Sequence, residues 1–94
     1  MAMAAFAQSV PQEATVREVV ASIPLPEGVK LLRLEFREDS TGDPAIFVIY
    51  SIDEPLKSSD EWIRELSALR DTARSRIRDL DESRFPYFRF VAAQ

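Results

Sequence analysis

The stretch Ala45-Ile-Phe-Val-Ile-Tyr-Ser-Ile52 decides the fold, because every residue in it except Ser51 is apolar. A strand with one wet face alternates apolar and polar residues, whereas a strand that is apolar on both sides is typical of the middle of a sheet. We therefore expect residues 45–52 to form a central strand. The rest of the chain is interpreted around it.

The segment before this strand predicts a hairpin partner. Apolar and charged residues alternate within 29–37, which is typical of a half-buried strand. The alternating residues are Leu32, Arg33, Leu34, Glu35, Phe36 and Arg37. Asp39-Ser-Thr-Gly-Asp-Pro44 is rich in turn-forming residues, with Gly42 available for a positive φ. Strands 29–37 and 45–52 should therefore pair antiparallel.

Two helices are expected on either side of the hairpin. The first covers 10–22, with Ser9 as its cap, Pro11 in its first turn and Pro24 just beyond its end. Its narrow apolar stripe is Ala14, Val16, Val19, Val20 and Ile23. The second begins after a cap at Ser58 and runs to about residue 80, following the 3.6-residue period of a helix. Its stripe is Trp62, Leu66, Leu69, Ala73, Ile77 and Leu80.

A last strand is expected over 84–91, with Pro86 near its start or on an edge. A right-handed strand–helix–strand crossover sets it parallel to 45–52. The predicted fold class is therefore α+β, a single α-β-β-α-β domain whose three-stranded mixed sheet carries both helices on one face. The domain should span 9–94, and residues 1–8 should form a flexible N-terminal segment.

This architecture leaves one sheet face without a helical layer. Depending on the register, that face carries one of two apolar sets: Ala45, Phe47 and Ile49, or Ile46, Val48, Tyr50 and Ile52. An exposed apolar patch of this kind is typical of an interface. We expect Phe47, Ile49 and Tyr87 to contact a protein partner, in a homodimer or a heteromeric complex.

The composition of the chain excludes several classes of catalytic, metal and phosphate-binding site. The 94 residues include 12 basic and 16 acidic ones, for a net charge of −4, and neither Cys nor His. Thiolate or imidazole metal sites and Cys–His or Ser–His–Asp nucleophiles are therefore excluded. Gly28 and Gly42 are the only glycines and lie far apart, so no phosphate-binding glycine loop exists. The sequence predicts a non-catalytic protein without cofactors.

No apolar run is long enough to span a membrane, and the apolar start lacks the basic residues of a secretory signal. A cytoplasmic location without membrane contact is the expectation.

Acidic residues crowd both ends of the central strand. They are Glu38, Asp39 and Asp43 at one end, and Asp53 and Glu54 at the other. Paired carboxylates bind Mg²⁺ or Ca²⁺ in many proteins, but this spacing lacks the pattern of an EF-hand. Turn formation and solvation explain them, so no metal site is predicted.

Arginines are the alternative candidates. Arg70, Arg74 and Arg78 lie four residues apart, along one side of the long helix, and Arg89 lies among the aromatic residues of the last strand. Such groups can bind phosphates or an acidic protein. They support an alternative function, binding of RNA or of the ribosome. The simpler interpretation is a solvated face on which acidic residues balance the arginines, namely Asp71, Asp79, Asp81 and Glu82.

Two resemblances extend these expectations. The order helix–hairpin–helix–strand over 10–91 resembles the type II KH-like fold, as in the ribosome-binding factor A family, although the Gly bend of its helix–turn–helix is absent. The stretch Glu38-Asp-Ser-Thr-Gly-Asp-Pro-Ala45 and the terminal Phe85-Pro-Tyr-Phe-Arg-Phe90 are similar to small prokaryotic proteins that accompany HEPN-like helical proteins in two-gene cassettes. This second resemblance implies an antitoxin-like binder and transfers no site residue.

Overall fold

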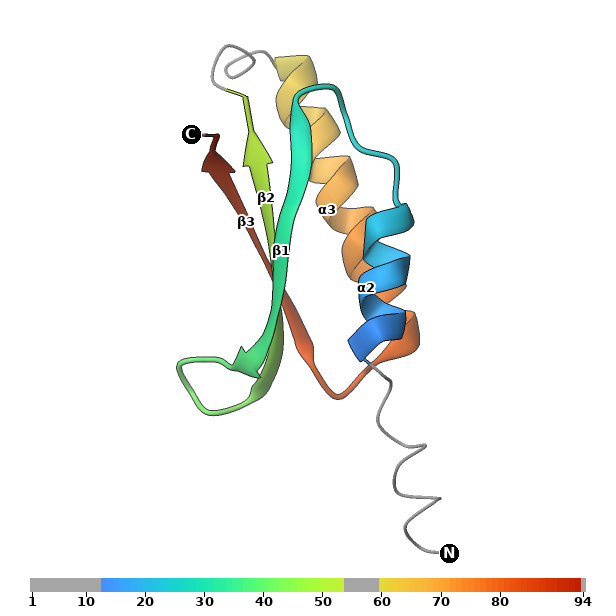
Figure 1. Cartoon of the computed structure of the whole chain (residues 1–94), viewed down its shortest axis with the longest axis vertical. Coiled ribbons are helices and arrows are strands. Elements are labelled where there is room, and N and C mark those ends of the chain that lie inside the picture. Colours follow the sequence, from blue (N-terminus) through green and yellow to red (C-terminus); the bar gives the residue numbers. More distant parts are fainter. Residues whose placement is uncertain (1–12, 54–59, 94) are drawn as a thin grey trace, which may run out of the picture.

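The computed structural model describes residues 13–53 and 60–93 and shows the predicted α-β-β-α-β order (Figure 1). Helix α2 spans Glu13–Ser22, strand β1 spans Val29–Glu38, and strand β2 spans Pro44–Ile52. Helix α3 spans Asp60–Leu80, and strand β3 spans Phe85–Ala92. The expected segment 1–8, the start of the first helix at Ser9 and Pro11, and the cap at Ser58 lie outside the described residues.

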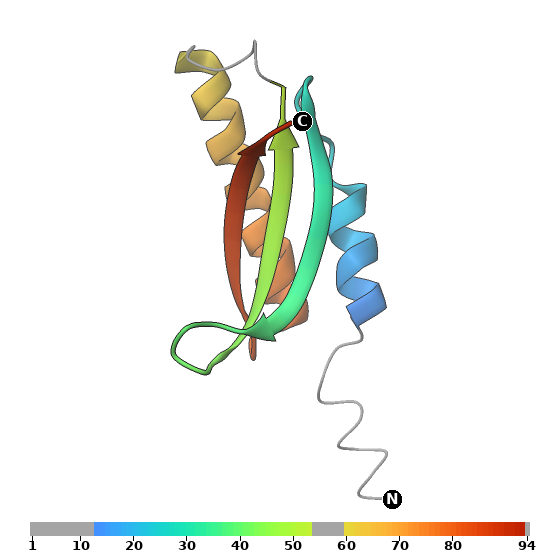
Figure 2. The same ribbon diagram turned by 60° about the vertical axis from the view of Figure 1, so that its left-hand side comes forward.

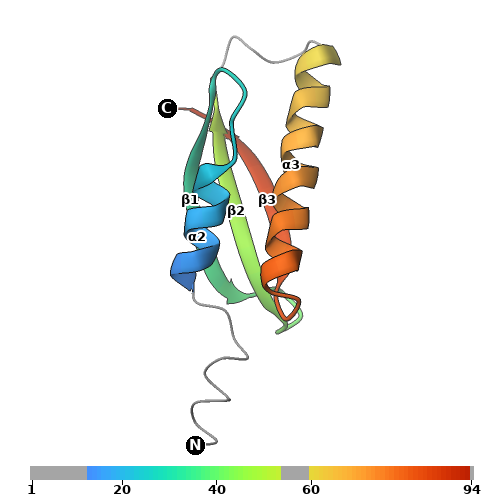
Figure 3. The same cartoon turned by 90° about the vertical axis from the view of Figure 1, so that its right-hand side faces the viewer.

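The sheet has the order β1-β2-β3, and the predicted middle strand lies in the middle. β1 pairs antiparallel with β2, and β3 pairs parallel with β2, as the crossover rule predicts. Figures 1 and 3 show both helices on one side of the sheet. The fold class and the strand order expected from the sequence are therefore confirmed.

The core lies between the helices and the inner face of the sheet. Ile46, Val48 and Tyr50 of β2 are fully buried there, beneath the apolar stripes of the helices. The stripe predicted for α3 packs inward throughout, with Leu69, Ala73 and Ile77 among its buried members. In α2 only part of the predicted stripe packs: Val16 and Val20 are buried, whereas Ala14 is exposed.

The hairpin turn forms as its residue types predict. The Asp39 amide donates to the Asp43 carbonyl over 2.8 Å, and the Gly42 amide donates to the Asp39 carbonyl over 3.0 Å. Gly42 has a φ of 89°, which residues with a Cβ rarely adopt. The Asp39 carboxylate also accepts hydrogen bonds from the amides of Thr41 and Asp43. Asp39 therefore acts as the internal anchor of the turn.

The connection from α3 to β3 corrects one expectation. Asp81 was expected on a solvated face that balances the arginines, but it is only 3% exposed. Its carboxylate accepts hydrogen bonds from the amide and hydroxyl of Ser83, and the Arg84 guanidinium lies 3.5 Å from it. A buried carboxylate needs such partners, so Asp81 organises the turn that starts β3.

Candidate functional site

The candidate site is the sheet face turned away from the helices, here called the open face (Figure 2). Side chains alternate along a strand, and Ile46, Val48 and Tyr50 of β2 point into the core. Ala45, Phe47 and Ile49 therefore point to the open face, which settles the register left undecided by the sequence. No helix or strand of the described residues lies over this face.

Side chains of the flanking strands cover the middle strand in place of a second layer. Phe47 is only 8% exposed and Ile49 only 3%. The Arg37 guanidinium lies 3.8 Å from the centre of the Phe47 ring, and the Tyr87 ring stacks on the other side at 5.1 Å. The long side chains of arginines can cover apolar surface while keeping their charge in water. The expectation of a bare apolar middle strand is therefore wrong.

The exposed apolar surface lies on the two flanking strands instead. We call these residues the open-face patch: Leu32, Phe85, Tyr87 and Val91, which are 50%, 48%, 36% and 36% exposed. Leu32 belongs to a register shift in β1 between Leu31 and Arg33. The three β3 residues alternate along one strand, and the rings of Phe85 and Tyr87 contact each other at 4.9 Å. Most of the patch is therefore one row on β3.

Cations surround this patch. Lys30, Arg33 and Arg37 of β1 share the open face with Arg89 of β3. Glu35 lies between Arg33 and Arg37 and accepts a hydrogen bond from each, at 2.8 and 2.9 Å. These two guanidinium groups lower the pKa of Glu35. Within the described part of the chain, Arg89 makes no ion pair or ring contact, so its guanidinium is available to a ligand.

A hydrogen bond links the hairpin turn to β3 across this face. The Tyr87 hydroxyl donates to the Asp39 carboxylate over 2.8 Å. The pKa of Asp39 is lowered well below its usual value, first by the Thr41 hydroxyl and then by Tyr87, and the same bond raises the pKa of Tyr87. Beside this link is a hollow of about 230 Å³. It is lined by Arg37, Asp39, Ser40, Phe47, Tyr87 and Arg89.

The structure brings the three predicted partner-binding residues together. Phe47, Ile49 and Tyr87 share the open face, but only Tyr87 exposes enough surface to contact another molecule. Sequence reasoning missed Leu32, Phe85 and Val91, whose face depends on the strand register. Alternation from Tyr87 along the last strand was the signal that could have found Phe85 and Val91.

The arginines proposed for nucleic acid do not form one surface. Arg70 and Arg74 of α3 both lie 3.6 Å from Asp71, and Arg74 also lies over the ring of the inward-facing Phe88. Arg89 lies on the other side of the sheet, next to Ile49 in the register. Arg78 is an exposed residue near the end of α3. The grouping of Arg89 with the helix arginines is therefore corrected.

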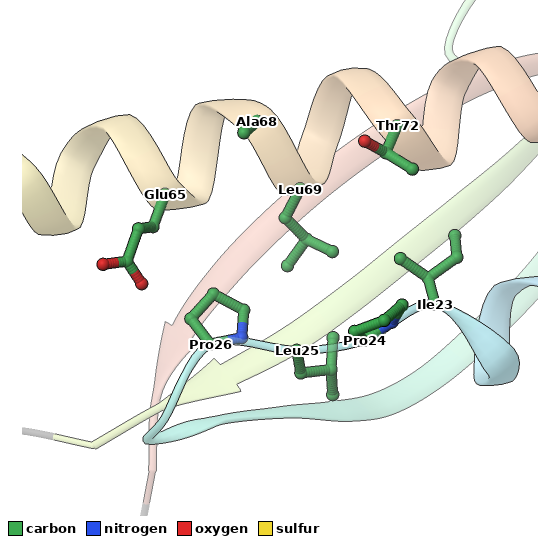
Figure 4. Close-up of a pocket in the computed structure, with 8 residues that line it drawn as sticks. All are labelled: Ile23, Pro24, Leu25, Pro26, Glu65, Ala68, Leu69 and Thr72. Carbon is green, nitrogen blue, oxygen red and sulfur yellow. The ribbon is translucent and has the colours of Figure 1, made fainter.

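A second hollow lies on the helical side, between α3 and the segment that follows α2 (Figure 4). It has a volume of about 390 Å³ and is lined by Ile23, Pro24, Leu25, Pro26, Glu65, Ala68, Leu69 and Thr72. The surface is almost entirely apolar, with few polar atoms that could orient a small molecule. This hollow therefore offers fewer groups that could recognise a ligand than the open face does.

Among residues 13–53 and 60–93, no three acidic side chains gather closely enough to hold a metal ion. In the same ranges, no helix has the length and hydropathy needed to cross a membrane. The arrangement supports recognition by stacking, apolar contact and ion pairing.

No protein-family model, curated protein or solved structure matches the chain, so comparison with known proteins assigns it to no family.

Proposed function

We propose that this chain is a non-catalytic protein-interaction module that binds an acidic protein surface on its open face. The observation that supports the proposal is the combination of an exposed apolar row on β3 with four cations on a face that lacks a helical layer. Interfaces are enriched in Tyr, Phe and Arg, which are the residue types gathered here. The fitting partner carries carboxylates around an apolar side chain.

The face offers two kinds of contact. Phe85 and Tyr87 present half-exposed rings, and burial of aromatic rings often dominates the energy of an interface. Arg89 can bind a carboxylate through two parallel hydrogen bonds, because the guanidinium group is a planar fork. Arg37 is already held by Glu35 and the Phe47 ring, so its ordering costs little on binding.

Charge favours a compact acidic protein surface over a long polyanion. On the open face four cations outnumber the carboxylates of Glu35 and Asp39, whereas the chain as a whole has a net charge of −4, so the remaining surface is more acidic than this face. A nucleic acid strand that extends past the open face meets this acidic surface and is repelled. A protein contact limited to the face meets mainly the cations.

The experiment compares two identical charge reversals on opposite faces. Arg89→Glu alters the open face, and Arg78→Glu alters the helical layer, while both change the net charge by the same amount. Tagged wild-type and variant proteins are used to capture partners from the source cells, and each retained protein is quantified by mass spectrometry. We expect a partner retained by wild type and Arg78→Glu but reduced at least tenfold with Arg89→Glu.

The candidate partner is then purified, and its Kd is measured for the three proteins. A tenfold or greater rise in Kd with Arg89→Glu alone supports the proposal. Equal Kd values for all three proteins overturn it, since the open face would then contribute nothing to binding.

A second candidate function is binding of single-stranded RNA on the same face. The observation that favours it is the position of the Phe85 and Tyr87 rings beside Arg89, since stacked bases and flanking cations hold single strands. α3 is continuous over 60–80, so this range holds no helix–turn–helix of the KH type. Binding of a fluorescent 12-nucleotide uridine or adenine oligomer at 50 mM salt tests it. Loss of binding with Arg89→Glu and retention with Arg78→Glu supports it, whereas absence of binding removes it.

The antitoxin-like role stays a prediction of the resemblance to companions of HEPN-like proteins. Co-expression with the product of the neighbouring gene, followed by co-purification, tests it. Co-purification that depends on Arg89 would identify the acidic partner, and independent purification of the two proteins would contradict the role.

A further inference from the structure

The hydrogen bonds at the strand ends show which backbone groups of β3 face the free edge. The Ala93 amide donates to the Ile52 carbonyl of β2 over 2.9 Å. Backbone groups of successive residues in a strand point to opposite sides, so the amides of Tyr87, Arg89 and Val91 also face β2. Those of Phe88, Phe90 and Ala92 point outward. The Asp53 amide donates to the carbonyl of Gly28, the residue just before β1, which gives the same alternation on β2.

Pro86 fits this pattern. Pro86 lies two residues before Phe88 in the alternation, so its nitrogen also points to the free edge. Its missing N–H therefore removes no bond to β2. From Phe88 onward the edge of β3 has a full set of donors and acceptors. Figure 1 shows the C-terminal half of β3 at the outer margin of the sheet, and no strand among the described residues lies beyond it.

The other edge of the sheet is less suited to pairing. β1 has a register shift between Leu31 and Arg33, and charged residues occupy much of its length. Bulges and charges on an edge strand block the addition of another strand. In β3 Arg89 is the only charged residue, and Phe85, Tyr87 and Val91 remain exposed beside the edge.

We propose that β3 pairs antiparallel with β3 of a second copy of this chain, about a two-fold axis at Phe90. In this register Phe88 lies opposite Ala92 of the second copy, and every outward N–H from Phe88 to Ala92 meets a carbonyl. A two-fold axis at Phe88 would instead set Pro86 opposite Phe90 and leave one carbonyl without a donor in each copy. A free edge that complements itself in this way favours a second copy over an unrelated strand.

The pairing joins two sheets into one of six strands. Opposite residues of an antiparallel pair point to the same side, so Arg89 of one copy lies beside Val91 of the other on the open face. Both open faces then lie on the same side of the continuous sheet. One strand pair forms a small interface, so we expect a dimer with a Kd of roughly micromolar or weaker.

Cysteine cross-linking tests the register, because the chain has no native Cys. Arg89 and Val91 of the two copies form pairs without ladder hydrogen bonds, whose Cα atoms lie about 4.5 Å apart, within disulfide range. The double variant Arg89→Cys/Val91→Cys should give a covalent dimer under mild oxidation. The control Tyr87→Cys/Arg89→Cys, whose cysteines lie opposite each other in the register about Phe88 but not in the register about Phe90, should stay mainly monomeric. Equal cross-linking of both variants, or of neither, overturns the proposed register.

Sedimentation of the unmodified chain from about 10 μM to 1 mM tests the dimer itself, a range chosen for a weak interface. We expect dimer formation to be lost with Ala92→Pro, which removes an outward N–H, and kept with Glu38→Pro, which does the same on β1. Circular dichroism should show both variants folded. A monomer throughout this range, or an unaffected dimer in Ala92→Pro, overturns the pairing. Neither readout requires a foreign partner, so failure here is distinct from failure of the proposed function.

Discussion

The buried Tyr50 hydroxyl should make the protein sensitive to alkali. Tyr50 is fully buried on the core side of β2, and its hydroxyl has no hydrogen-bond partner within the described part of the chain. Burial raises the pKa of Tyr50 from 10.0 to about 12. Because the folded-state pKa is raised, its contribution to stability is complete below pH 10 and is lost as pH rises toward 12.

The size of the effect follows from this shift. One pKa unit corresponds to about 1.4 kcal/mol, so Tyr50 should lower the free energy of unfolding by about 1.4 kcal/mol at pH 11. Tyr50→Phe should remove this loss. At neutral pH it should change stability by less than about 1 kcal/mol, because it deletes a hydroxyl that has no partner.

Urea denaturation at pH 8 and pH 11 measures the difference for wild type, Tyr50→Phe and Tyr87→Phe. The Tyr87 hydroxyl also has a raised pKa, but it is exposed, so its replacement should remove less of the alkaline loss. An alkaline loss in Tyr50→Phe as large as that in wild type would refute the reasoning. It would also contradict the register that turns Tyr50 inward and Phe47 outward.

Three further predictions concern named contacts. The pKa of Asp39 is lowered in the folded chain, so its carboxylate stabilises the fold above about pH 3.8 and this stability is lost as the pH falls toward the lowered pKa. Asp39→Asn should remove this contribution, so thermal melts from pH 2 to 6 should show a smaller acid-induced fall in Tm for the variant than for wild type. Asp81→Ala should cost about 3 kcal/mol in urea denaturation, because it leaves Arg84 without its partner, whereas the exposed Asp79→Ala should cost under about 0.5 kcal/mol. Ile77→Ala, in the core, should lower the free energy of unfolding by about 2–5 kcal/mol. Ile63→Ala, on the surface of α3, should lower it by under about 1 kcal/mol, and similar losses for the two variants would contradict the packing of α3.

The sequence was sufficient for the architecture because local patterns and chain connectivity agree. The apolar run 45–52 placed the middle strand, and the period of the long helix predicted which side of α3 packs inward. The crossover rule then gave the parallel pairing of β3. The turn at Gly42 formed as its residue types predict.

The composition of the open face was harder to predict, because it depends on register and on long-range contacts. The alternation of the sequence did not show whether Phe47 or Tyr50 points toward the helices, and only their packing in the folded chain shows it. The covering of Phe47 by Arg37 and Tyr87 joins three strands, so no local pattern contains it. Asp81 was expected among the acidic residues that balance the arginines on a solvated face, and its partners Ser83 and Arg84 are visible only in the folded chain.

The central claim is that the open face contacts the partner, and the two tyrosines allow a direct measurement. Hydroxyl-radical footprinting is carried out on the free chain and on the chain isolated with its partner. In the free chain Tyr87, which is 36% exposed, should be oxidised much faster than the fully buried Tyr50. In the complex we expect protection of Tyr87, Phe85 and Val91, with no change at Ile63 on the helical layer. Unchanged oxidation of Tyr87 together with protection of Ile63 would contradict the claim.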